Sequence, residues 1–255
     1  MQQQSGLQRL LGGADPDPID FFNPQGQADV LLVCEHAGQY IPQRLEGLGL
    51  KKADLDKHIG WDIGAAALTK ALATRLNAPA ILQRYSRLVI DCNRPPNAPD
   101  AMPEMADNIL IPGNKNLSPI EEKLRAEEIF WPFHHGVDQA ISSKQFRLVL
   151  SIHSFNPVLG AVPRPWPLAF LFRGDAQTPE KLAAAISKDQ PNISIGMNQP
   201  YQIDDESDWF VPRHGELNNI PHSLIEVRND QISDKIGQNF WADQLAHAVT
   251  QLMED

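Results

Sequence analysis

The chain has 255 residues, of which 42% are hydrophobic and 21% charged, a composition typical of a globular protein that buries a full core as one domain. Its formal net charge of −10 disfavours nucleic acid and anionic membranes as partners, because an acidic surface repels phosphate. No apolar run is long enough to span a bilayer, and the N-terminus lacks the pattern of a signal peptide, so we expect a cytoplasmic protein.

Near-continuous apolar runs predict buried strands, and segments with helical spacing of apolar residues separate them. In chain order, we expect an arm over residues 1–25, a strand over 28–34, a helix over 62–76, strands over 80–83 and 88–92, a helix over 118–143, strands over 146–152 and 168–172, a helix over 178–188, a strand over 222–227 and a helix over 234–253. Ser118 and Glu121 have the spacing of a capping box. This alternation predicts a single three-layer α/β domain over residues 1–255, with a mostly parallel or mixed central sheet.

Histidines follow two of the predicted strands, at the edge of an open α/β sheet where ligands bind. His36 follows the first strand in the sequence CEHAG, and His153 follows a later strand in SIHS. Two neutral imidazoles and one carboxylate form a common catalytic zinc site with an open position for water. We therefore expect His36 and His153 to bind one divalent metal, with zinc as the first candidate. A histidine that is hydrogen-bonded within a turn is the alternative for either residue alone.

The apolar run over residues 88–92 is preceded by Arg87 and followed by Asn93 and Arg94. Arginine binds a carboxylate through a planar two-point fork, and asparagine adds a neutral donor. These residues predict a small-molecule substrate that carries a carboxylate. The alternative is that each arginine pairs with a nearby acidic side chain, since the chain has many of them.

Glu226 lies near the end of the last apolar strand, where burial would raise the pKa of its carboxyl group towards that of a general base. We expect this side chain to deprotonate an attacking water and to pass the proton to the departing amine. A salt bridge with Arg228 is the alternative, because residues two apart on a strand share one face.

Four ordered motifs, CEHAG, RLVIDCNRP, SIHS and PHSLIEVRND, resemble the N-formylglutamate amidohydrolase family, which is similar to zinc carboxypeptidases and aspartoacylase-like hydrolases. The resemblance covers most of the chain. It implies a phosphorylase/hydrolase-like α/β fold and a zinc-dependent amidohydrolase that releases a formyl group from an N-acyl acidic amino acid. By this resemblance His36 and His153 would be metal ligands. Asn93 and Arg94 would hold a substrate carboxylate, and Glu226 would be the catalytic glutamate.

One position departs from the pattern of the related zinc enzymes, which have a glutamate ligand three residues after the first histidine. This chain has Gln39 there, so the third ligand must come from elsewhere. We expect it to be Asp62, which precedes the first long helix and whose alternative role is that of an N-cap. Glu35 is the second candidate, although its place next to a histidine predicts that it points away. Tyr201 and His214 are further candidates for contacts with the substrate.

Three other functions fit the same sequence. The chain could be a hydrolase of other N-acyl amino acids or peptides, or a catalytically silent binding protein, which Gln39 would favour. It could also be a cysteine hydrolase, but Cys34 and Cys92 both lie in apolar runs, where we expect buried, reduced thiols. We expect His58 and His134 to have packing roles. The sequence indicates no particular oligomeric state.

Overall fold

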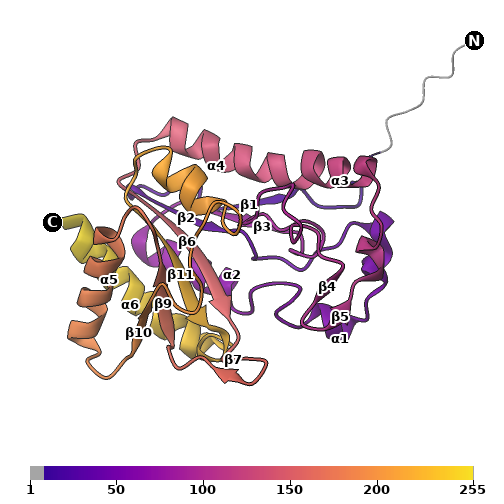
Figure 1. The fold of residues 1–255 in the computed structure, drawn as a ribbon. Coiled ribbons are helices and arrows are strands. Elements are labelled where there is room, and N and C mark those ends of the chain that lie inside the picture. Colours follow the sequence, from indigo (N-terminus) through magenta and orange to yellow (C-terminus); the bar gives the residue numbers. More distant parts are fainter. Residues whose placement is uncertain (1–8, 255) are drawn as a thin grey trace, which may run out of the picture.

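The computed structural model describes residues 9–254, and a seven-stranded sheet lies at their centre (Figure 1). In spatial order the strands are β1 (Ile19–Phe22), β3 (Ala80–Gln83), β2 (Val30–Cys34), β6 (Leu148–Phe155), β11 (His222–Arg228), β9 (Leu168–Leu171) and β10 (Ile195–Met197). The β1–β3 and β11–β9 pairs are antiparallel, and the other pairs are parallel. The predicted α/β class with a mixed central sheet is therefore confirmed.

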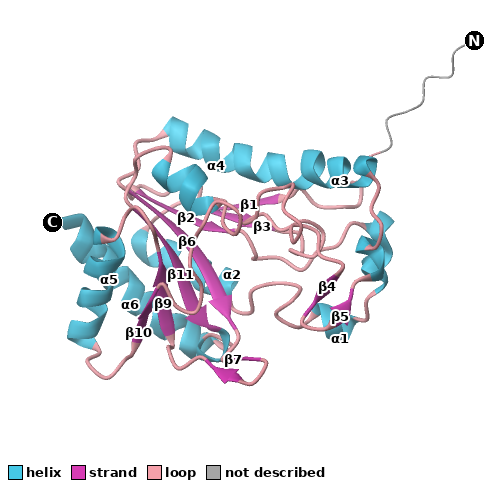
Figure 2. Cartoon of the chain, viewed as in Figure 1, coloured by secondary structure: helices cyan, strands magenta, loops and turns pink. Residues whose placement is uncertain are grey.

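Helices cover both faces of this sheet (Figure 2). On one face lie α2 (Ala65–Leu76), α5 (Gln177–Asp189) and α6 (Lys235–Glu254). The other face is covered by α3 (Pro119–Arg125), a π-helical turn (Ala126–Phe130) and α4 (Trp131–Ser143). The predicted capping box of Ser118 and Glu121 is confirmed at the start of α3. Within residues 9–254, no helix combines the length and the apolar character that crossing a lipid bilayer requires.

Several short elements lie outside the central sheet and the long helices. They are α1 (Lys52–Leu55), the hairpin of β4 (Met105–Ala106) and β5 (Ile109–Leu110), the hairpin of β7 (Val158–Leu159) and β8 (Val162–Pro163), 3₁₀ turns at Gln43–Gly49, Pro112–Asn114 and Asn229–Gln231, and a π-helical turn at Val211–Glu216.

The near-continuous apolar sequence of β2 follows from burial of both its faces. Leu32 and Cys34 pack in the core with α2 and α6, whereas Leu31 and Val33 pack on the opposite face with residues such as Phe133 of α4. Successive strand residues point to opposite faces, so every position of this strand lies in one core or the other. Polar residues begin only where the strand leaves the sheet.

The order of strands reverses at β2, which pairs with β3 on one side and with β6 on the other. The chain passes from β2 through α2 to β3, and later through α3 and α4 to β6. At such a reversal the connections leave in opposite directions and open a crevice at the carboxyl ends of the strands. His36 follows β2, and His153 lies two residues before the end of β6, so both histidines reach this crevice.

The prediction of a strand over residues 88–92 is wrong, because these residues form turns. Their apolar side chains are buried beneath α3 and α4 rather than in the sheet. Two side chains satisfy the buried backbone, since Asn114 donates to the Leu88 carbonyl at 2.9 Å and Arg125 donates to the Val89 carbonyl at 2.9 Å. Buried carbonyls need such partners, and here they come from side chains distant in sequence instead of from a neighbouring strand.

The expectation of an N-terminal arm over residues 1–25 is also wrong in part. Residues 1–8 lie outside the described part of the chain, but Ile19–Phe22 form the edge strand β1, which pairs with β3. The strand Ile195–Met197 was not predicted at all, because its three residues include a glycine and carry little apolar signal. Both are edge strands, where the burial that marks a strand in sequence is incomplete.

Candidate metal centre and cleft

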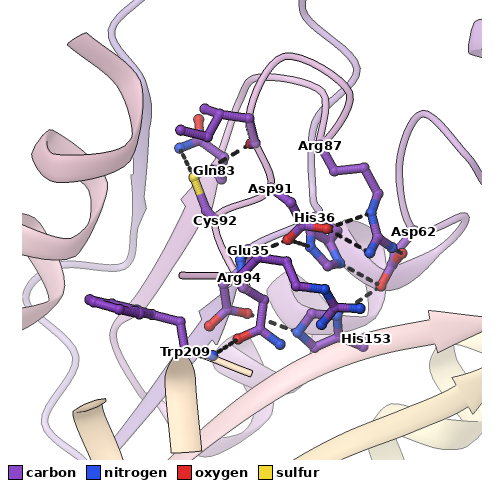
Figure 3. Close-up of polar contacts among 12 residues, drawn as sticks. Glu35, His36, Asp62, Gln83, Arg87, Asp91, Cys92, Arg94, His153 and Trp209 are labelled. Atoms are coloured by element: carbon purple, nitrogen blue, oxygen red, sulfur yellow. Dashed lines mark hydrogen bonds and ion pairs between the residues drawn. The ribbon is translucent and has the colours of Figure 1, made fainter. Parts of the chain in front are cut away.

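Three buried side chains, His36, Asp62 and His153, converge at the carboxyl ends of β2 and β6 (Figure 3). One potential ligand atom from each lies within 4.8 Å of the others. The Asp62 Oδ2 atom is 3.5 Å from Nδ1 of His36 and 3.0 Å from Nδ1 of His153. We call these three residues the His–Asp–His cluster. Two imidazole nitrogens and one carboxylate oxygen are a donor set suited to zinc.

The turn before α2 places Asp62 in this cluster. Its backbone N–H donates to the carbonyl of His36 at 2.9 Å, and its Oδ2 accepts from the backbone N–H of Ser154 at 3.0 Å. Gly64, which follows in the turn, has φ +84°, and a Cβ atom there would lie 2.3 Å from the carbonyl oxygen of Ile232. The N-cap position of α2 is this glycine. The alternative role of Asp62 as the N-cap is therefore wrong.

A carboxylate holds each imidazole by its other ring nitrogen. Nε2 of His36 is 2.6 Å from Oδ1 of Asp91, and Nε2 of His153 is 3.0 Å from Oε2 of Glu35. These contacts direct both Nδ1 atoms towards Asp62. Carboxylates that bond the outer nitrogen of a ligand histidine fix its tautomer and orientation, and they are typical of metal centres.

The charges of the cluster also fit a cation. Burial would raise the pKa of Asp62, but the charge of His36 and the hydrogen bond from His153 outweigh burial and hold this pKa well below its usual range. Burial would lower the pKa of His153, but hydrogen bonds to Asp62 and Glu35 raise it well above its usual range. Among residues 9–254, Nδ1 of His36 has no hydrogen-bond partner although it is buried. A divalent cation would displace the proton of His153 and would give Nδ1 of His36 a partner.

The prediction that Glu35 points away from the site is wrong. Its Oε2 accepts from Ser151 Oγ at 2.6 Å and contacts His153. Glu35 continues the alternation of Leu31 and Val33, so it lies on the face of the sheet that also carries Ser151 and His153. Counting faces along the strand would have placed it there from the sequence.

Arg87 lies beside the cluster and is already paired with its carboxylates. Its Nε and Nη2 donate to Oδ2 of Asp91 at 3.0 and 2.7 Å, and its Nη1 is 3.4 Å from Oδ1 of Asp62. Burial would raise the pKa of Asp91, but Arg87 and His36 hold it well below its usual range. This arginine therefore neutralises the acidic groups around the cluster, which is the alternative considered for it.

Glu226 of β11 lies next to His153, because the two residues are partners in the parallel register of β11 and β6. It is buried, and its Oε2 atom has no hydrogen-bond partner in the described part of the chain. Burial raises the pKa of Glu226 to about 8. Arg228 donates to Asp230 at 2.7 Å instead, so the alternative of a salt bridge with Glu226 is wrong.

These groups line two adjoining pockets, which we call the inner and outer parts of one cleft. Its inner part, of about 320 Å³, contains the His–Asp–His cluster and Glu226. Its outer part, of about 270 Å³, reaches the β4–β5 and β7–β8 hairpins at Met105 and Leu159. The two parts share His58, Arg87, Arg94 and Tyr201. The combined volume suits a small molecule of amino-acid size.

Asn93 and Arg94 both line this cleft but are engaged with the protein. Nδ2 of Asn93 donates to Asp208 at 2.8 Å, and its Oδ1 accepts from the backbone of Phe210 at 2.9 Å. Arg94 donates to Asp100 at 2.9 Å and to a backbone carbonyl. Asn93 thus fixes the loop around residue 208, and Arg94 has a carboxylate partner.

Three further histidines, His58, His134 and His214, lie in the cleft or in the core. His214 does not line the cleft, which corrects our expectation: it is 0% exposed, and its Nε2 lies 2.9 Å from Nδ1 of His134. His134 also contacts the carbonyl of Cys92 at 2.8 Å, which fits its predicted packing role. His58 does line the cleft, with its Nδ1 3.6 Å from Oδ1 of Asp62, and sequence reasoning missed it.

The two cysteines are buried and free, as predicted. Burial raises the pKa of the Cys34 thiol and that of the Cys92 thiol well above their usual range. A thiol that is not ionised is a poor nucleophile, so the structure gives no support to a cysteine hydrolase.

Comparison with known proteins gives a family and two similar structures. The model of the family N-formylglutamate amidohydrolase matches residues 28–233. The crystal structure of gene product Atu2144 from Agrobacterium tumefaciens has a TM-score of 0.90 and 32% identity, covering 96% of this chain and 100% of that one. The N-formylglutamate amidohydrolase from Ralstonia eutropha has a TM-score of 0.67 and 16% identity, covering 94% of this chain and 98% of that one. None of the curated protein sequences matches the chain.

Proposed function

The chain belongs to the N-formylglutamate amidohydrolase family, and from that premise we propose that it is a metal-dependent hydrolase that cleaves the amide bond of an N-acyl amino acid. N-formylglutamate is the first substrate to test. The observation that carries this proposal is the buried His–Asp–His cluster beside buried Glu226, whose Oε2 has no hydrogen-bond partner within residues 9–254, in the inner part of the cleft. Hydrolysis of an amide needs an activated water, a polarised carbonyl and a proton for the amine, and these groups suit those needs.

The ligands for one divalent metal would be Nδ1 of His36, Nδ1 of His153 and a carboxylate oxygen of Asp62. The mixture of nitrogen and oxygen donors favours zinc. A bound zinc ion would supply Lewis-acid polarisation of the scissile carbonyl and would lower the pKa of a water molecule to about 7. Asp91 and Glu35 keep the two imidazoles in the orientation that binding requires.

Glu226 would move the proton. As a carboxylate it accepts a proton from the attacking water while the water oxygen forms a bond to the acyl carbon. As a carboxylic acid it then donates this proton to the amide nitrogen while the C–N bond breaks, which gives formate and the free amino acid. A pKa near neutrality serves both transfers, and burial of Glu226 raises its pKa to about 8.

A panel of substrates tests the proposal. We expect zinc-loaded protein to hydrolyse N-formyl-L-glutamate with a higher kcat/KM than N-acetyl- or N-succinyl-L-glutamate, and a chelator to remove the activity until zinc is restored. Preference for another acyl group would assign the chain to a related N-acyl-amino-acid hydrolase. Absence of turnover with every compound, in protein that binds zinc, would instead support a silent binding protein.

Replacing Asp91 by asparagine should weaken zinc binding roughly 10- to 100-fold, because the outer nitrogen of His36 loses its charged partner. Competition titration against a chromophoric chelator measures this affinity. Asp100→Asn is the matched control, since Asp100 also pairs with an arginine at the cleft but makes no contact with the cluster among residues 9–254. Equal zinc affinity in Asp91→Asn and wild type would remove Asp91 from the metal centre.

A further inference from the structure

The arginines at the cleft differ in whether a carboxylate neutralises them. Arg87 is paired with Asp91, and Arg94 is paired with Asp100. Arg164 lines the outer part of the cleft, and within residues 9–254 no carboxylate lies within ion-pair distance of its guanidinium. Arg87 and Arg94, the arginines that the sequence predicted to bind a substrate carboxylate, are therefore already paired. Arg164 was not predicted to bind the substrate.

Arg164 is a buried cation, with only 5% of its surface exposed. Its guanidinium carbon lies 4.8 Å from the ring centroid of Tyr201 and 5.7 Å from that of Phe155. The backbone is fixed as well, because the Arg164 N–H donates to the Pro157 carbonyl at 2.8 Å. The Tyr201 hydroxyl is also a hydrogen-bond partner of Arg164, but a guanidinium carries five N–H donors, more than one hydroxyl can accept. The arrangement presents a preformed site for an anion.

This site lies close to the proposed reaction centre. Phe155, under the guanidinium, is two residues beyond His153 on β6 and so points to the same face. Tyr201 borders both parts of the cleft. Burial raises the pKa of Glu226, and the positive charge of Arg164 is among the nearby charges that lower this pKa. A ligand that spans the cleft can therefore reach Arg164 and the cluster together.

We propose that Arg164, supported by Tyr201, binds a carboxylate on the amine half of the substrate and so selects N-acyl amino acids over neutral amides. This inference rests on the proposed function of the same cleft. The planar guanidinium binds a carboxylate through two parallel hydrogen bonds, which fixes the direction of the substrate as well as its position. Arg164 is thus a specificity-determining residue, whereas Arg87 and Arg94 are held by Asp91 and Asp100.

Binding measured without turnover tests the proposal. In the full-length Glu226→Gln protein, calorimetry compares N-formyl-L-glutamate with its two monoamides, in which either the α-carboxylate or the side-chain carboxylate is neutral. Adding Arg164→Met should raise Kd for the diacid about 10- to 100-fold, because a charge-assisted two-point bond is lost. One of the two monoamides lacks the carboxylate that Arg164 binds, and its Kd should not change. Arg147→Met, at the amino end of β6, is the matched control and should leave every Kd unchanged.

A Kd for the diacid that Arg164→Met leaves unchanged would overturn the inference, and so would an equal rise for all three ligands or failure of the diacid to bind the parent. If Arg164→Met does not fold, Arg164→Lys keeps the charge but loses the fork, and its weakening should again spare one monoamide. Turnover by the wild type is measured separately. Binding that depends on Arg164 without turnover would contradict the proposed hydrolysis and leave the carboxylate site standing.

Discussion

Glu226→Gln is expected to lower kcat for N-formyl-L-glutamate by a factor of about 10² to 10⁴, the usual contribution of a general acid–base group. Glutamine has nearly the same shape but cannot accept a proton from water or return it to the amine. The fold should be retained, because Glu226 is buried next to His153 and forms no ion pair within residues 9–254 whose loss would strand a charge. Steady-state kinetics at saturating zinc measure the effect.

The dependence of kcat on pH is a second test of the role of Glu226. A general base must be ionised, so kcat should fall as the pH drops below the pKa of Glu226. Burial raises this pKa to about 8, and a bound cation would lower it again, which places the acidic limb at or below pH 8. The residual activity of Glu226→Gln should lack this limb, because glutamine does not titrate.

Glu180→Gln is the control for this substitution, because Glu180 lies exposed in the first turn of α5. It should retain wild-type kcat. Wild-type turnover in Glu226→Gln, with the zinc content unchanged, would contradict the assignment of proton transfer to Glu226.

His36→Ala is expected to reduce bound zinc from about one ion per chain to a small fraction and to reduce turnover to the uncatalysed background. This variant tests the centre more cleanly than His153→Ala. Removing His36 leaves Asp91 paired with Arg87, whereas removing His153 leaves Glu35 buried with Ser151 as its hydrogen-bond partner. A buried, unpaired charge is strongly destabilising, so loss of His153 would combine a binding effect with a folding effect.

Elemental analysis of protein purified without chelator measures the zinc, and a thermal melt reports the fold. His247→Ala is the control, because His247 is half exposed on α6 and pairs with Asp189. A full zinc content in His36→Ala would contradict the metal centre. Turnover by wild-type protein that does not rise and fall with its zinc content would contradict it as well.

The sequence predicted the central strands because burial of both faces leaves a continuous apolar signal, as in β2 and β6. The same signal was misleading over residues 88–92, where the run is buried but lies outside the sheet. Whether a buried apolar run forms a strand depends on which groups hydrogen-bond to its backbone. Here the partners are the side chains of Arg125 and Asn114, more than twenty residues away in the sequence. Such a long-range partner leaves no local pattern to read.

The candidate site was predictable where polar residues lie at or near the carboxyl ends of apolar strands, since His36, His153 and Glu226 meet in the inner part of the cleft. Its supporting carboxylates were harder to find. Asp91 was hidden within the apolar run that was taken for a strand, although Glu35 could have been placed by alternation along β2. Arg164 was not predicted, because only the folded arrangement shows that Arg87 and Arg94 have carboxylate partners and that Arg164 has none among residues 9–254.

Anomalous diffraction at the zinc edge, from crystals of chelator-free protein, tests the central claim most directly. The proposed centre predicts one strong peak bonded to Nδ1 of His36, Nδ1 of His153 and a carboxylate oxygen of Asp62. Crystals of active protein with no anomalous peak at these three atoms, or with the metal bound by other residues, would contradict it.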